Sequence, residues 1–222
     1  MIWDDWLLDH RRMALHRPTG TLVVGDLHLG YLNFRQRLGD SVPLESLAEE
    51  LLPLEQAWND LRPCGLLIAG DLVERQATGL ISAFAEWAHD RSISILGLVP
   101  GNHDNGIQLP PFPVLDQGHQ LGRWRISHDD DALPEPLVHG HRHPAIPLPG
   151  HGMAACFVVS QSRVMLPAYS AHAAGGSVLR RSIVPWPEGE VIAMAGGRLE
   201  NLGDINALRA ILGPNQRKKR RL

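Results

Sequence analysis

Apolar residues recur along this chain in short runs that alternate with amphipathic stretches. The runs "WLLDH" at 6–10, "MALHR" at 13–17 and "TLVVGD" at 21–26 predict neighbouring antiparallel strands. "GLLIAGD" at 65–71 and "ISILGLV" at 93–99 predict two further buried strands. Helical spacing of apolar residues separates these last three runs, over 43–62 and 79–90. A strand–helix–strand–helix–strand order predicts parallel pairing with helical crossovers, and hence an α/β layer.

Pro53 interrupts the first helical stretch, and because proline has no N–H to donate, we expect two helices there. After Gly101 the pattern changes to short apolar runs separated by Pro, Gly and Asp, which predicts a second, more antiparallel sheet packed on the first. A last helix is expected over 204–212. The fold class is therefore α/β, a two-sheet sandwich flanked by helices, in a single domain over 1–215. Residues 216–222 are expected to form a basic, disordered tail.

Composition narrows the class of protein. The chain has 222 residues, 44% apolar content and a formal net charge of -3, which excludes a generally basic nucleic-acid coat protein but not a local basic patch. Cys64 and Cys156 lie far apart in apolar runs and are expected to be buried, reduced thiols. The N-terminus is acidic and no apolar run approaches the ~18 residues of a membrane span, so we expect a cytoplasmic protein without membrane association. The sequence does not determine the oligomeric state.

Polar side chains of one kind follow the predicted strands. Carboxylates, imidazoles and one amide stand at five strand ends, and ligands of open α/β sheets bind where such ends converge. Alternate residues of an extended chain point to one face, so the first pair can reach one point. The candidates in chain order are Asp26, His28, Asp71, Asn102, His128, His141 and His143.

Each of these motifs also has a structural explanation. "DLH" occurs often by chance, "GD" can cap a helix and "GNHD" can form a turn. Five motifs, "DLH", "GD", "GNHD", His128 and "GHRH", all stand at strand ends, and this joint occurrence favours a shared site. Mixed carboxylate, imidazole and amide donors without thiolate suit Mn²⁺, Fe²⁺ or Zn²⁺, with Mn²⁺ preferred. One tetrahedral ion cannot use so many ligands, whereas two ions roughly 3.5–4 Å apart can if one carboxylate bridges them.

The series D-x-H, GD, GNHD, H and GHxH resembles the calcineurin-like metallophosphoesterase superfamily, whose fold is a two-sheet αββα sandwich. The resemblance implies that Asp26, His28, Asp71 and His143 hold one ion, and that Asp71, Asn102, His128 and His141 hold the other. Asp71 is then the bridging ligand. A metal-bridging hydroxide would attack phosphorus in line, and His103 would act as the general acid. Asp104 or Glu74 would orient His103 or a ligand.

Longer stretches, among them "GDLHLGYLNFRQRLGDSVP" and "RVMLPAYSAHAAGG", resemble the bacterial DNA ligase-associated metallophosphoesterases. This resemblance implies a phosphodiesterase, a nuclease acting on DNA in repair beside an ATP-dependent ligase and a helicase. The alternative is a phosphoesterase or pyrophosphohydrolase for a small nucleotide or nucleotide sugar, because a metal site reads only the phosphate. Two departures from the pattern are Tyr31 in place of lysine and Asp129 in place of glycine. The tail residues 217–221 are either a solvated segment or a set of phosphate contacts.

Overall fold

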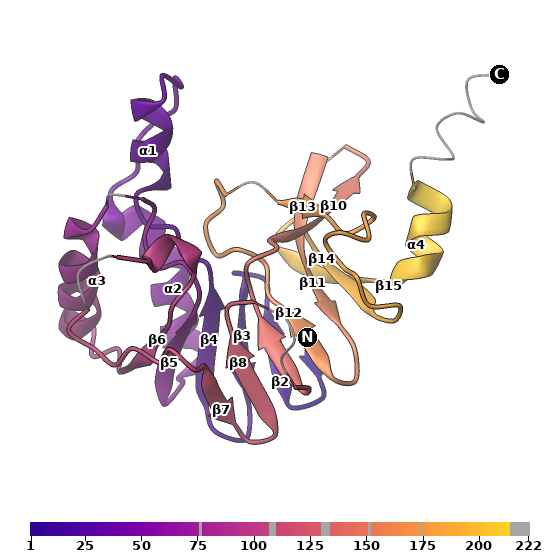
Figure 1. Cartoon of the computed structure of the whole chain (residues 1–222), viewed down its shortest axis with the longest axis horizontal. Coiled ribbons are helices and arrows are strands. Elements are labelled where there is room, and N and C mark those ends of the chain that lie inside the picture. Colours follow the sequence, from indigo (N-terminus) through magenta and orange to yellow (C-terminus); the bar gives the residue numbers. More distant parts are fainter. Residues whose placement is uncertain (76, 107–109, 130–133, 151, 174, 214–222) are drawn as a thin grey trace.

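The computed structural model describes residues 1–75, 77–106, 110–129, 134–150, 152–173 and 175–213. Two β-sheets pack face to face, with helices outside them (Figure 1). The predicted basic tail at 216–222 lies outside the described residues, and the limits of the expected domain, 1–215, stay a prediction.

The first sheet has the order β1-β2-β3-β4-β5-β6. Its first four strands form antiparallel hairpins, while β4, β5 and β6 are parallel, as predicted. Gly25 of β4 lies beside Ala69 of β5, and Ala69 lies beside Val99 of β6, so these three strands end together. The strands are β1 (Ile2–Trp3), β2 (Trp6–Asp9), β3 (Met13–His16), β4 (Thr21–Gly25), β5 (Gly65–Ala69) and β6 (Ile95–Val99).

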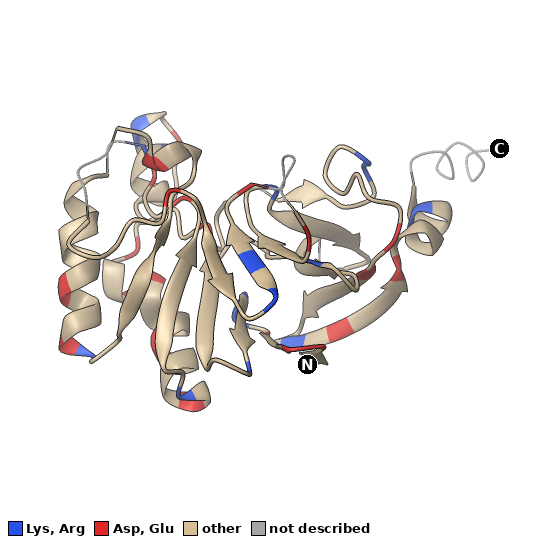
Figure 2. Ribbon diagram, turned by 60° about the horizontal axis from the view of Figure 1, so that its bottom comes forward, with Lys and Arg blue, Asp and Glu red and all other residues tan. Residues whose placement is uncertain are grey.

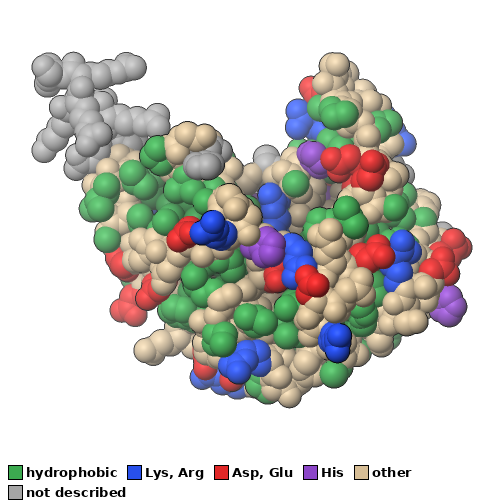
Figure 3. Space-filling model, turned by 180° about the vertical axis from the view of Figure 1, so that it is seen from behind, with side chains coloured by type: hydrophobic (Ala, Val, Ile, Leu, Met, Phe, Trp, Pro, Cys, Tyr) green, Lys and Arg blue, Asp and Glu red, His purple; other side chains and the backbone are tan. Residues whose placement is uncertain are grey.

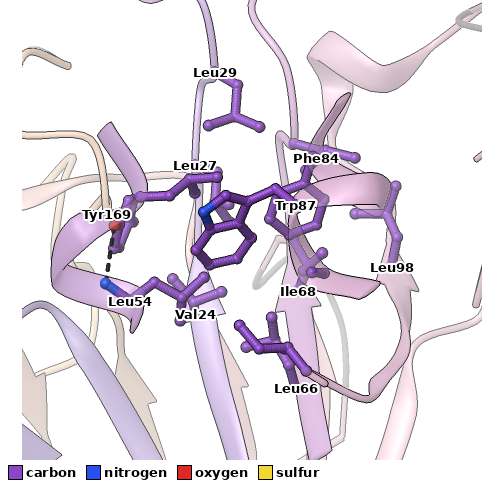
Figure 4. Packing of buried hydrophobic residues seen from close by; sticks show 14 of the residues in the cluster. Val24, Leu27, Leu29, Leu54, Leu66, Ile68, Phe84, Trp87, Leu98 and Tyr169 are labelled. Carbon is purple, nitrogen blue, oxygen red and sulfur yellow. Dashed lines mark hydrogen bonds between the residues drawn. The ribbon is translucent and has the colours of Figure 1, made fainter. Parts of the chain in front are cut away.

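Helices α2 and α3 cover the outer face of this sheet. Figure 4 shows Trp87 and Phe84 of α3 packed with Val24, Ile68 and other apolar residues of the sheet and of α2. α3 has the predicted bounds, and α1 was not predicted because its seven residues are too few for a clear period. The helices on this side are α1 (Tyr31–Arg37), α2 (Leu47–Leu61) and α3 (Gly79–Asp90), with a 3₁₀ turn η1 (Asn102–Asp104) after β6.

The prediction of two helices divided at Pro53 is wrong, because α2 runs through this residue. Its ladder is completed by a side chain from elsewhere in the chain. The Tyr169 hydroxyl donates to the Glu50 carbonyl at 2.8 Å and accepts from the Leu54 N–H at 3.2 Å. The Tyr169–Leu54 contact is the dashed line in Figure 4. A tertiary contact thus bridges two backbone groups that would otherwise pair within the helix.

The second sheet has the order β13-β10-β11-β12-β9-β8-β7, and β14 and β15 extend it from β11. It is mixed: β8, β9 and β12 are mutually parallel, which the expectation of a more antiparallel sheet did not include. Its strands are β7 (His119–Leu121), β8 (Trp124–Ser127), β9 (Leu137–His139), β10 (Pro144–Leu148), β11 (Gly152–Val159), β12 (Arg163–Met165), β13 (Gly176–Ser177), β14 (Glu190–Ala195) and β15 (Arg198–Asp204).

Buried apolar side chains fill the space between the sheets and on both outer faces. Trp6 and Trp124 meet edge to face between the sheets, with ring centroids 5.9 Å apart. The outer face of the second sheet packs against α4 (Ile205–Leu212), so the predicted last helix is present, with Asp204 as its N-cap rather than its first residue. Cys156 is buried as expected, whereas Cys64 is exposed because it precedes β5 in a loop rather than lying within the strand.

Candidate metal centre

The aligned strand ends of both sheets form one rim, and the predicted site residues lie on it. Asp26 and His28 follow β4, Asp71 follows β5, and Asn102 lies in η1 after β6. In the second sheet Ser127 pairs with His139, so β8 and β9 also end together. His128 follows β8, and His141 and His143 follow β9.

Close contacts join the candidates of the two sheets. Asp26 lies 3.2 Å from His128 (Oδ1 to Nδ1) and 3.5 Å from His143 (Oδ2 to Nε2). His128 Nε2 in turn lies 3.1 Å from Asn102 Oδ1 and 3.0 Å from His141 Nδ1.

Asp71 lies between two groups of candidate ligands, one formed by His28 and His143 and the other by Asn102, His128 and His141. Its Oδ2 is 3.7 Å from His28 Nε2, and its Oδ1 is 3.8 Å from His128 Nε2. His28 Nε2 is also 3.3 Å from His143 Nε2. The structure therefore brings all of the candidate ligands together, with Asp71 in reach of both groups.

The backbone reaches this arrangement through left-handed conformations. Asp26, His28, His141 and His143 have φ values of 45°, 47°, 64° and 43°. β4 ends at Gly25, so the expectation that Asp26 and His28 converge by strand alternation is wrong. They converge because the chain turns at both residues, a conformation that non-glycine residues rarely adopt and that clusters at functional sites.

Three glycines let the backbone pass close to the carboxylates. A Cβ at Gly70 or Gly140 would overlap the Asp26 carboxylate, and a Cβ at Gly101 would overlap that of Asp71. Glycine, which has no Cβ, therefore allows the backbone to pass close to the site at these three positions.

Glu74 makes two contacts that the sequence did not specify. It is buried, and its Oε2 lies 3.2 Å from His28 Nδ1 while its Oε1 lies 2.9 Å from His103 Nδ1. Asp104 instead accepts the N–H groups of Leu72 and Gly101 and so holds the turn. Of the two candidate orienting carboxylates, the geometry favours Glu74.

The electrostatics of the cluster favour charged side chains in spite of burial. Burial acts to raise the pKa of Asp26, but contact with His128 and the charges of His143, His128 and His28 hold that pKa below its usual value. Burial acts to lower the pKa of His28, and the neighbouring Glu74, Asp26 and Asp71 carboxylates raise it. Buried carboxylates of this kind require a cationic partner, and divalent ions can take the place of protonated imidazoles.

The donor set fits the expected ions. Three groups of side chains each present one donor atom per residue within 4.8 Å of one another. Two of these groups consist of predicted ligands, and the third includes His103 and Glu74, which the sequence assigned to other roles. The groups are Asp26–His28–His143, Asp26–Asp71–His128 and His28–Glu74–His103.

Comparison with known proteins agrees with this geometry. The sequence profile of the calcineurin-like phosphoesterase family matches residues 20–154, more than half of the chain. Among the curated proteins nothing matches. A crystal structure of the Pseudomonas putida nuclease MPE aligns with a TM-score of 0.71 and 20% identity, covering 89% of this chain and 94% of that chain. At this identity the likeness shows a shared fold.

Proposed function

Because this chain belongs to the calcineurin-like phosphoesterase family, and is therefore a metal-dependent phosphoesterase, we propose that it is a phosphodiesterase that cleaves nucleic acid. The web of contacts that places Asp71 within 4 Å of both His28 and His128 carries this proposal. A nuclease of the same fold supports a nucleic-acid substrate. The resemblance to the ligase-associated group supports DNA as that substrate and a role in repair.

In this proposal the seven rim residues hold two divalent ions, with Mn²⁺ as the native metal and Asp71 as the shared ligand. Such ions, when bound, would supply positive charge to neutralise the phosphodiester and would lower the pKa of a water, the expected nucleophile. Asp26 contacts Nδ1 of His128, and Glu74 contacts Nδ1 of His28. These contacts orient both imidazoles so that Nε2 of each is directed to the metal site.

His103 acts on the leaving group. Glu74 contacts its Nδ1, which leaves Nε2 as the nitrogen that gives a proton to the departing oxygen. The His103 backbone N–H donates to Asp71 Oδ1 at 2.8 Å, so the acid is fixed beside the shared ligand. A positioned general acid of this kind contributes roughly 10²–10⁴-fold to the rate.

Hydrolysis assays test the proposal. The protein is stripped with chelator, reloaded with Mn²⁺, Fe²⁺ or Zn²⁺, and given an aryl phosphodiester, an aryl phosphomonoester, single- and double-stranded DNA, and mononucleotides. We expect diester and DNA cleavage that requires metal and is strongest with Mn²⁺. Turnover of mononucleotides without DNA cleavage would contradict the proposal and support the small-nucleotide alternative.

Variants separate the roles of the residues. Asp71→Asn should abolish both metal binding and cleavage, whereas His103→Asn should retain metal and lose most of the rate. His89→Asn, on an exposed position of α3, is the matched control and should behave as the wild type. Loss of metal in His103→Asn would show that His103 is a ligand instead.

The cellular context is part of the same proposal. No helix in the part of the chain that the structure describes is long and apolar enough to cross a membrane. We propose a cytoplasmic protein that works with an ATP-dependent DNA ligase and a helicase. Co-purification of the tagged protein with those enzymes, lost after nuclease treatment if DNA alone joins them, would measure the association.

A further inference from the structure

A small recess opens beside the candidate metal ligand His143. Its volume is ≈ 60 Å³, and its walls come from the turn between β2 and β3, from β10 and β11, and from the segment after β12. Most of the lining side chains are alanines; the charged one is Arg12. The volume is far below the roughly 300 Å³ of a small-molecule pocket, so the recess is an extension of the metal centre rather than a separate ligand site.

Arg12 enters this recess without an acidic partner. Its guanidinium Nη1 donates to the backbone carbonyls of Ser170 at 2.8 Å and Ala168 at 3.4 Å. Among the described residues no carboxylate lies within ion-pair distance of Arg12. Its neighbour Arg11, by contrast, contacts Asp9 at 2.7 Å and Asp60 at 2.6 Å.

Arg12 also lies at the level of the candidate ligands. Residues 10–12 connect β2 to β3, and Met13 of β3 pairs with Val24 of β4, two residues before Asp26. Arg12 itself has a left-handed φ of 72°, which turns the chain at the rim. Because this half-buried guanidinium bonds to backbone carbonyls through Nη1, it keeps its charge and its Nε and Nη2 donors for an anion.

A second recess beside the centre has a different charge. Its volume is ≈ 330 Å³, and its lining includes the candidate ligands Asn102 and His128. Its charged residues are Arg125, Asp116 and Asp129, so the carboxylates outnumber the guanidinium. The lining of the Arg12 recess includes a guanidinium and no carboxylate, so this recess suits an anionic group better than the larger one does.

The basic residues of the described part are scattered. The chain has two lysines, Lys218 and Lys219, and both lie outside the described residues. The described part therefore contains arginine but no lysine. In Figure 2 these residues are interspersed with Asp and Glu rather than gathered into a stripe. Seen from behind, the surface is hollowed between the lobe that carries α1 and the lobe that carries α4 (Figure 3). Because the described arginines form no stripe, a cation beside the centre has more influence on how a nucleic-acid strand is held.

We propose that the Arg12 recess binds the phosphate adjacent to the scissile one in a nucleic-acid strand. The inference rests on the proposed function, because only a strand carries a second phosphate next to the one being cleaved. Arg12 is a substrate-binding residue in this proposal, and it determines which flank of the cleaved bond is anchored.

Dinucleotides with one added phosphate test the proposal. The substrates are a thymidine dinucleotide, the same dinucleotide with a 5′-terminal phosphate, and the same with a 3′-terminal phosphate. In the Mn²⁺-loaded wild type, one of the added phosphates should raise kcat/KM by roughly ten- to hundredfold, the range of a charge-assisted hydrogen bond. Arg12→Met keeps the apolar stem and should lose that gain, whereas Arg11→Met, the matched control, should keep it.

The comparison is a ratio within each variant, so a general loss of activity cancels. Cleavage of all three dinucleotides with equal gains in wild type and Arg12→Met would overturn the inference alone. Hydrolysis of the aryl diester with no cleavage of any dinucleotide would overturn the proposed function and the inference with it.

Binding gives a readout independent of turnover. The affinity of a single-stranded fluorescent oligonucleotide is measured by anisotropy at several salt concentrations, in the slowly cleaving His103→Asn background. Adding Arg12→Met should reduce the slope of log Kd against log salt by about 0.7, the value for one lost phosphate contact on a single strand. An unchanged slope would overturn the inference, since Arg12 would then only hold the backbone after β12.

Discussion

Replacing Glu74 with Gln tests whether one carboxylate supports both metal binding and acid catalysis. Glu74 is 2% exposed and presents one oxygen to His28 and the other to His103, at 3.2 and 2.9 Å. A glutamine amide has one acceptor oxygen and one donor nitrogen. Its oxygen can accept from the Nδ1–H group of one imidazole. Its NH₂ group then faces the Nδ1–H group of the other imidazole, and because both are donors, that contact is lost.

The magnitude follows from which contact is lost. If Gln faces His103 with its nitrogen, kcat at saturating metal falls by part of the roughly 10²–10⁴-fold that a general acid supplies. If it faces His28 with its nitrogen, Mn²⁺ affinity falls about ten- to hundredfold, as for other carboxylates that orient a metal-bound imidazole. That loss corresponds to about 1.4–2.7 kcal/mol.

Calorimetric Mn²⁺ titration and steady-state hydrolysis of an aryl diester measure the two effects separately. Glu86→Gln, on an exposed position of α3, is the control of equal chemistry and should change neither. Asp104→Asn should lower thermal stability, because Asp104 accepts two backbone N–H groups of the turn. A Glu74→Gln protein with wild-type Mn²⁺ affinity and wild-type kcat would refute the reasoning.

Three further predictions concern stability, packing and pH. Tyr169→Phe should destabilise the protein by about 1–3 kcal/mol in denaturant unfolding without altering Mn²⁺ affinity, because the retained ring keeps the Leu54 N–H and the Glu50 carbonyl apart while no hydroxyl bonds to either; unchanged stability would contradict the account of α2. Gly140→Ala should weaken Mn²⁺ binding in a titration because its Cβ overlaps Asp26, and wild-type affinity would show that the carboxylate has room to move. In the metal-free protein the raised pKa of His28 stabilises the fold fully below the unfolded value of 6.5, and this contribution is lost as pH rises through the folded pKa. Tm without metal should therefore fall above pH 6.5, while Mn²⁺ affinity rises over the same window because protons no longer compete; a flat metal-free Tm would refute this linkage.

The strand ends were predictable because hydrophobic patterning locates them well. Runs such as "TLVVGD" and "GLLIAGD" stop where a polar motif begins, and parallel pairing then brings their ends to one rim. The continuity of α2 was not predictable, since it depends on Tyr169, more than a hundred residues away. The double contact of Glu74 was equally hidden, because the path of the loop after β5, rather than residue spacing, aims its carboxylate between two imidazoles.

The left-handed backbone at Asp26 and His28 is likewise a result of tertiary structure rather than of the local sequence pattern. A strand that continued past Gly25 would place Asp26 and Leu27 on opposite faces and leave no reason for a left-handed turn. The observed φ values at Asp26 and His28 cost of order 1–3 kcal/mol each. The buried cores on both sides of the first sheet hold β4 in place, and the carboxylate–imidazole contacts across the rim favour the turn. The strain is thus supported by the sandwich as a whole, and binding of divalent cations to these carboxylates would stabilise the fold by an amount that grows with the logarithm of the ratio of cation concentration to Kd.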